Sequence, residues 1–114
     1  MTRALAGLPP TEDQFVVRII ELAKATGWLV THFRPARTQR GWRTPVQGDK
    51  GFPDLVLARD GVVLIRECKV DTTRPNPGQR AWLAEIGPLG AVWRPRDWDP
   101  VIVPTLTAPR RCTS

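Results

Sequence analysis

The chain has 114 residues and a net charge of +6, from 17 lysines and arginines against 11 aspartates and glutamates. Two cysteines are too few for a disulfide framework, and one histidine without a CxxC motif argues against a structural zinc site. Residues 1–10 lack the apolar core of a signal peptide, and no apolar run is long enough to cross a bilayer. We therefore expect one soluble, cytoplasmic domain without a membrane partner. Its basic charge is typical of nucleic-acid binding, with a solvated basic surface as the alternative.

The first half of the chain predicts a flexible start, a helix, a strand and a loop. Residues 1–10 end in Pro9-Pro10, and Thr11 with Gln14 has the spacing of a capping box. A helix is expected over residues 12–26, ended by Gly27. The segment WLVTHF (28–33) is rich in aromatic and β-branched residues and predicts a strand. In residues 34–51 the apolar residues follow neither the helical nor the strand period, so we expect a long mobile basic loop.

A tight β-hairpin is predicted around Asp60-Gly61, which lies between two apolar runs. With a two-residue turn, the register places Asp54 directly opposite Glu67. Side chains alternate between faces, so Glu67 and Lys69 share the face of Asp54, and Cys68 lies on the other. Both faces are mostly apolar, and we expect this hairpin at the centre of a sheet that is covered on both sides.

The second half predicts a helix, a strand and an irregular end. Asn76 can cap a helix that starts at Pro77, has Gln79 at its third position, and stops near Gly87. Residues 91–94 predict a short strand, and residues 96–106 a last helix or irregular cap. The domain is expected to span residues 11–104, followed by a frayed basic tail over 105–114. The order α-β-β-β-α-β predicts an α/β domain.

The opposed carboxylates pose an electrostatic problem. Directly opposed Cβ atoms are about 4.5–5.5 Å apart, so Asp54 and Glu67 both ionise only around a cation. Otherwise one of them keeps a proton. Lys69 supplies one charge, and Mg²⁺ or Mn²⁺ would supply more. A salt bridge of Lys69 with either acid at a solvated strand end explains the pattern equally well.

A third carboxylate is suggested by helical phase. Glu12 is in line with Val16 and Ile19, on the buried face of the first predicted helix. The alternative for Glu12 is a charge that complements the helix N-terminus. Asp13 and Glu21 are the other candidates.

These residues together match the pattern of a known family. The matching segments are Glu12, Gly27-Trp28, Gly51-Phe52-Pro53-Asp54-Leu55, Glu67-Cys68-Lys69, Gln79 with Trp82, and Trp93-Arg94-Pro95. In this order they resemble the PD-(D/E)XK nuclease superfamily. The finer resemblance is to the VRR-NUC domain in its small stand-alone bacteriophage form, over about residues 11–104.

The resemblance implies a restriction-endonuclease-like core, with a central mixed sheet flanked by helices, and a Mg²⁺-dependent DNA endonuclease that also accepts Mn²⁺. Asp54, Glu67 and the backbone carbonyl of Cys68 would bind the metal, and Glu12 would complete the acidic cluster. Lys69 would position or activate the attacking water. Gln79 would orient a ligand or the DNA backbone.

The resemblance also bears on partners. It implies a homodimer similar to Holliday junction resolvases, in the host cytoplasm if the protein is phage-encoded. Whether the substrate is a junction, flap, nick or duplex stays open, and a DNA-binding module without activity is the alternative. Trp42 would stack on a base or pack in the loop, and His32 would be packed or contact a phosphate. The expected phosphate contacts are Arg34, Arg37, Arg40, Arg43, Lys50, Arg74, Arg80, Arg110 and Arg111.

Overall fold

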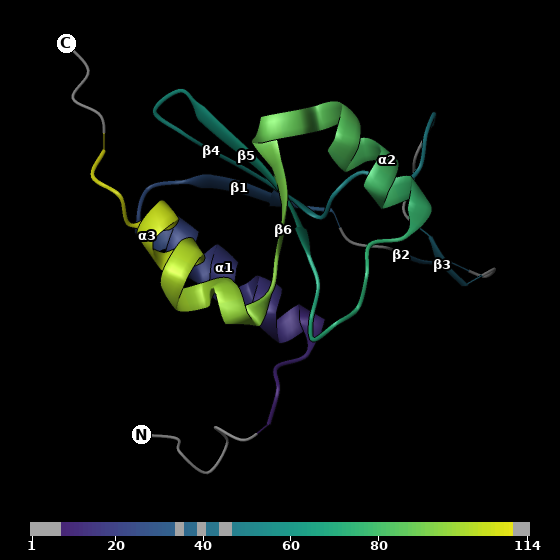
Figure 1. Cartoon of the computed structure of the whole chain (residues 1–114), viewed down its shortest axis with the longest axis horizontal. Coiled ribbons are helices and arrows are strands. Elements are labelled where there is room, and N and C mark those ends of the chain that lie inside the picture. The colour runs from purple at the N-terminus through teal and green to yellow at the C-terminus, as the bar shows by residue number, and fades with distance from the viewer. Residues whose placement is uncertain (1–7, 34–35, 39–40, 44–46, 111–114) are drawn as a thin grey trace.

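A four-stranded mixed sheet forms the centre of the protein (Figure 1). The structure, a computed structural model, describes residues 8–33, 36–38, 41–43 and 47–110. The strand order is β1-β4-β5-β6, with β5 and β6 parallel and the other neighbours antiparallel. The bounds are Leu29–His32 for β1, Leu55–Arg59 for β4, Val62–Cys68 for β5 and Gly90–Trp93 for β6. The predicted hairpin is therefore β4-β5, and it lies at the centre of the sheet as expected.

Both predicted helix caps are confirmed. Helix α1 spans Glu12–Ala25, and Thr11 and Gln14 exchange the two hydrogen bonds of a capping box. Helix α2 spans Pro77–Ile86 and is capped in the same way by Asn76 and Gln79. After α2, the turn Gly87–Leu89 leads into β6. Residues 95–106 are continuously helical, with a 3₁₀ turn Pro95–Asp97, a π turn Trp98–Ile102 and the short helix α3, Val103–Leu106.

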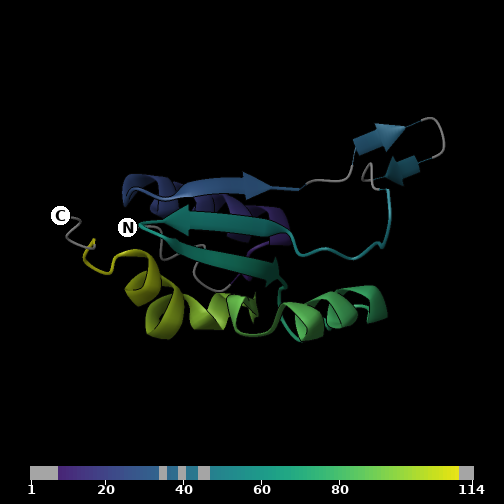
Figure 2. The same ribbon diagram turned by 90° about the horizontal axis from the view of Figure 1, so that it is seen from above.

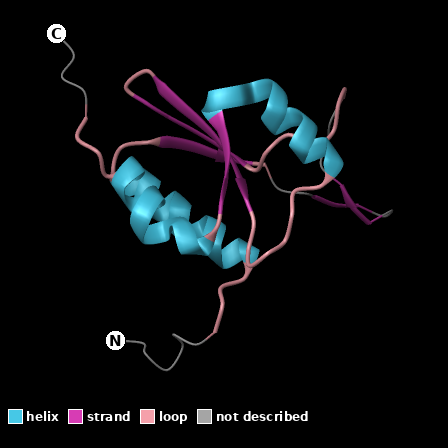
Figure 3. Ribbon diagram, viewed as in Figure 1, coloured by secondary structure: helices cyan, strands magenta, loops and turns pink. Residues whose placement is uncertain are grey.

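The core lies between one face of the sheet and two helical segments. Figure 3 shows α1 and α3 together on one side of the sheet and α2 on the other. Leu55 and Leu57 of β4 are fully buried against the apolar face of α1. The predicted helix face is confirmed, since the buried residues of α1 are Phe15, Val16, Ile19 and Ala23.

The opposite face of the sheet is only partly covered, which corrects the expectation of a doubly covered hairpin. Helix α2 packs closely over β6, where a Cβ on Gly90 would lie 3.3 Å from the Leu83 side chain. It does not reach the far edge, because Leu29 of β1 is 78% exposed and Val63 of β5 is 37% exposed. None of the helices in the described ranges is long and apolar enough to cross a membrane.

The segment 34–51 contains strands that the sequence did not predict. Ala36–Thr38 (β2) and Gly41–Arg43 (β3) pair antiparallel as a separate two-stranded sheet, apart from the main sheet (Figure 2). Three-residue strands are too short to show a period in the sequence, which explains why a loop was expected.

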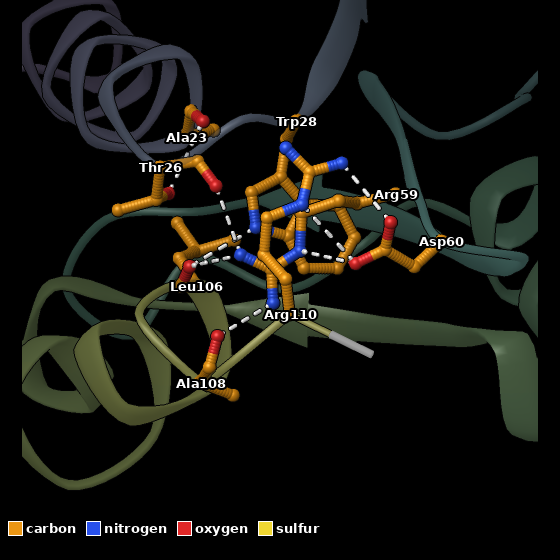
Figure 4. Close-up of polar contacts among 8 residues, drawn as sticks. All are labelled: Ala23, Thr26, Trp28, Arg59, Asp60, Leu106, Ala108 and Arg110. Atoms are coloured by element: carbon orange, nitrogen blue, oxygen red, sulfur yellow. Dashed lines mark hydrogen bonds and ion pairs between the residues drawn. The ribbon is translucent and has the colours of Figure 1, made fainter. Parts of the chain in front are cut away.

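The C-terminal segment is also more ordered than predicted. Leu106 is fully buried, so the domain extends beyond residue 104. The Arg59 side chain donates to the carbonyls of Thr26 at 2.9 Å and Ala108 at 2.7 Å, and stacks on the Trp28 ring (Figure 4). The Trp28 indole N–H in turn donates to the Leu106 carbonyl at 3.0 Å. This buried arginine ties the ends of α1 and α3 to the hairpin.

We expect Arg59→Ala to lower the free energy of unfolding by about 3 kcal/mol, because it removes charged donors from buried carbonyls. Urea unfolding followed by tryptophan fluorescence measures the loss. The matched control is Arg110→Ala, which removes the exposed arginine that pairs with Asp60 and should cost far less. Equal losses in the two variants would contradict the role of Arg59.

Candidate functional site

The predicted hairpin register is confirmed. Leu57 pairs with Leu64 and Leu55 with Arg66, so one further step places Asp54 opposite Glu67. Asp60 and Gly61 have φ values of 52° and 81°, as a two-residue hairpin turn with a left-handed backbone requires. The Phe33 amide donates to the Asp54 carbonyl at 2.8 Å, which fixes Asp54 against the end of β1 as well.

Asp54 is held by the backbone of β5. Its Oδ2 accepts a hydrogen bond of 3.0 Å from the Cys68 amide. The Lys69 amide donates to Trp93 of β6, so the neighbouring Cys68 carbonyl points toward β4. There it faces Pro53, which has no N–H to donate. The Cys68 carbonyl is thus aimed at the space beside Asp54, where the resemblance places a ligand.

Glu67 is a fully buried carboxyl group. Among the described residues, neither of its oxygens has a hydrogen-bond partner. The Lys69 Nζ lies 3.1 Å from Oε2 as an ion pair, but outside hydrogen-bonding angles. Burial, followed by the charge of Asp54, raises the pKa of Glu67 to about 7, and Lys69 opposes this shift. The expected conflict between the two acids is therefore present, and Lys69 relieves only part of it.

Glu12 lies at the edge of this cluster rather than inside it. The residue is exposed, although its position on α1 is in line with the buried Val16 and Ile19, as the helical phase predicts. Partial desolvation raises the pKa of Glu12; the charge of Lys69 opposes the shift, and Asp54 and Asp13 add to it. Within the described ranges, no three acidic, histidine or cysteine side chains come together to hold an ion. Glu21 is exposed and about two and a half turns further along α1.

The Gln79 side chain is used in the predicted cap of α2. Its Oε1 accepts from the Asn76 amide at 2.9 Å, which closes the capping box of α2. The start of α2 nevertheless abuts the site, because a Cβ on Gly51 would lie 2.5 Å from the Gly78 carbonyl carbon. Gly51 also has a φ of +104°, so both the close approach to Gly78 and the backbone conformation require glycine here.

Cys68 and His32 face away from the carboxylates. Cys68 is fully buried in the core, in register with Trp93, and burial raises the pKa of its thiol. Its predicted side-chain direction is therefore confirmed. His32 pairs with Leu55, so it lies on the same core face and not on the face of Asp54.

The expected phosphate contacts are only partly described. Lys50, Arg74 and Arg80 are exposed, and Arg80 donates to the Pro75 carbonyl. Arg110 lies at the other end of the hairpin, paired with Asp60. Arg34, Arg40 and Arg111 fall outside the described residues, and for Arg37, Trp42 and Arg43 the description covers the backbone alone.

An aromatic group beside the carboxylates was not predicted. Phe33 and Phe52 meet edge to face, as do Phe52 and Trp82. For Phe52 the sequence offered a clue, because this residue lies two positions before Asp54 and must therefore be near it. Phe33 gave none, because only the pairing of β1 with β4 brings it here.

No family model, curated protein or solved structure matches the chain. The site is therefore interpreted from its own geometry: two opposed carboxylates, one of them buried without a hydrogen bond, a lysine and a carbonyl that faces a proline.

The raised pKa of Glu67 makes stability depend on pH. An unfolded glutamate titrates near 4.5 and folded Glu67 near 7, so only the unfolded chain releases this proton between these values. The stabilising contribution is complete below pH 4.5 and is lost as pH rises toward 7. We expect wild type to lose on the order of 2 kcal/mol relative to Glu67→Gln across this window. Urea unfolding at several pH values measures the difference.

Glu85→Gln, which changes an exposed carboxyl of α2, is the matched control. If the free energy of unfolding changes with pH in the same way for wild type and Glu67→Gln, the raised pKa of Glu67 is contradicted.

Proposed function

We propose that this protein is a metal-dependent DNA endonuclease whose centre lies at Asp54, Glu67 and Lys69. The observation that carries the proposal is Glu67, which is fully buried opposite a second carboxylate and has no hydrogen bond to either oxygen from the described part of the chain. A buried carboxylate of this kind is costly unless a cation completes it. The resemblance to VRR-NUC nucleases supports the same interpretation.

The residues present suit a hard cation. Glu67 offers two oxygens without hydrogen bonds, Asp54 offers the oxygen not used by Cys68, and the Cys68 carbonyl faces the same space. An all-oxygen set of this size suits Mg²⁺, which retains several waters, and also Mn²⁺. When bound, the metal would polarise a phosphodiester and lower the pKa of a coordinated water. Glu12, at the edge, would act through its charge.

The chain itself supplies positioning and charge. The Cys68 amide keeps Asp54 in one orientation, and Lys69 places an ammonium beside Glu67 where negative charge develops on a phosphate. Lys50, Arg74 and Arg80 are exposed and would bind backbone phosphates. The net charge of +6 offsets the repulsion of DNA by the acidic cluster. From the resemblance we further propose a homodimer, which would present two such sites to two strands.

A non-catalytic DNA-binding module is the second candidate, and a specific observation favours it. Lys69 already forms an ion pair with Glu67, and the described residues bring no third acid into the cluster. On this interpretation the ion pair only stabilises the strand end.

Divalent metal should stabilise the folded protein through the two acids. A ligand at one hundred times its Kd adds about 2.7 kcal/mol, which corresponds to roughly 10 °C in Tm for a domain of this size. We expect such a rise with Mn²⁺ for wild type, and little or none for Asp54→Asn and Glu67→Gln. An equal rise in all three proteins would place the metal elsewhere.

Cleavage distinguishes the two candidates. We expect wild type to cut supercoiled plasmid or a synthetic four-way junction in Mg²⁺ or Mn²⁺ but not in EDTA. Lys69→Ala should lower the rate by a factor of at least 100, because it removes positive charge from the developing phosphorane. Gel electrophoresis of the products measures the rate.

Lys24→Ala, which removes an exposed lysine at the end of α1, is the matched control and should cut normally. DNA binding without cutting, in either metal, would favour the binding module.

A further inference from the structure

We propose that the aromatic group of Phe33, Phe52 and Trp82 stacks an unpaired nucleobase next to the carboxylates, so that the preferred substrate is DNA with unpaired nucleotides at the cleavage site. This inference rests on the proposed nuclease and names its substrate class.

The three rings come from separate elements that meet at the site. Phe33 follows β1, Phe52 lies in the loop before β4, and Trp82 belongs to α2. The Phe33 and Phe52 centroids are 5.7 Å apart at 88°, and those of Phe52 and Trp82 are 5.1 Å apart at 82°. The rings thus form a continuous edge-to-face row.

The row lies beside the acids, on the same face of the sheet. The Phe33 amide donates to the Asp54 carbonyl, and the β1-β4 register places these two residues opposite one another. Directly opposed residues share a face, so the Phe33 side chain lies on the face of Asp54 and Glu67. A base resting on Phe33 would therefore bring its own phosphate to the carboxylates.

Two of the three rings are open to solvent, unlike the aromatic residues of the core. Phe33 is 44% exposed and Phe52 is 36% exposed, whereas Phe15 and Trp93 are each 2% exposed. Aromatic faces left open beside a basic surface are the usual elements of single-strand binding. Lys50 and Arg80, both exposed, lie on the same loop and helix and would bind the flanking phosphates.

The aromatic row is also held in place by the backbone around it. The Trp82 indole N–H donates to the Asp49 carbonyl at 3.3 Å, and Gly51 packs directly on Gly78. These contacts fix the loop that carries Phe52 against α2, so little conformational entropy would be lost on stacking. A base inside an intact duplex is already stacked and cannot reach such rings, which is why the row selects unpaired nucleotides.

The test measures binding in EDTA, so it does not depend on cleavage. The probes are two fluorescein-labelled duplexes of equal length, one fully paired and one with three unpaired nucleotides, the central one being 2-aminopurine. Stacking on aromatic rings should quench 2-aminopurine in the wild-type complex. Phe33→Leu should weaken binding of the unpaired probe by about tenfold and restore its fluorescence, while leaving the paired probe unchanged.

The matched control is Leu29→Ala, which changes an exposed apolar residue at the other end of β1 and should alter neither probe. Phe52→Leu is a second variant of the row that keeps an apolar side chain, and it should have the same effect as Phe33→Leu. The same effect in two variants is not explained by one variant failing to fold. Equal affinity for both probes, or unquenched 2-aminopurine in the complex, overturns the inference while the nuclease proposal stands. If Phe33→Leu instead converts a dimer to a monomer and leaves the quenching of 2-aminopurine unchanged, the row is a contact between two copies of the chain. That result also overturns the inference. Absent DNA binding overturns both proposals.

Discussion

The register of the β4-β5 hairpin is the constraint on which the rest of this structure depends. Asp60 and Gly61 adopt positive φ values, and this fixes every pair along the two strands. A slip of one residue would turn the leucines of β4 out of the core and separate the two carboxylates onto opposite faces. The turn therefore decides at once what is buried against α1 and which acids meet at the open end of the hairpin.

The two ends of this hairpin have opposite electrostatic characters. At the turn, the buried Arg59 donates to three backbone carbonyls and forms an ion pair with Asp60, so most of its charge is compensated and serves stability. At the open end, Glu67 is buried without a hydrogen bond, and its pKa is raised to about 7. Within the described residues, the buried arginine thus has several partners and the buried glutamate only Lys69, so the electrostatic cost is larger at the open end, where a cation could reduce it.

The open end is assembled from segments far apart in the sequence. Asp54 is held by Cys68 of β5 and faces Phe33, which follows β1, and the loop before it packs on the start of α2 through Gly51. Acids, exposed cations and open aromatic rings thus share one rim of the sheet.

The sequence by itself determined the features that follow local rules. The capping boxes of α1 and α2, the hairpin turn, its register and the face of Cys68 were all predicted, because each depends on residues a few positions apart. The pairing of Asp54 with Glu67 followed from the same arithmetic. Only the tertiary structure decided that Glu67 is completely buried, that Glu12 stays exposed at the edge of the cluster, and that Leu106 belongs to the core. It also brought Phe33 to Phe52. These outcomes depend on how β1, α2 and the C-terminal helices pack on the hairpin, and burial and long-range contacts of this kind leave no periodic signal in the chain.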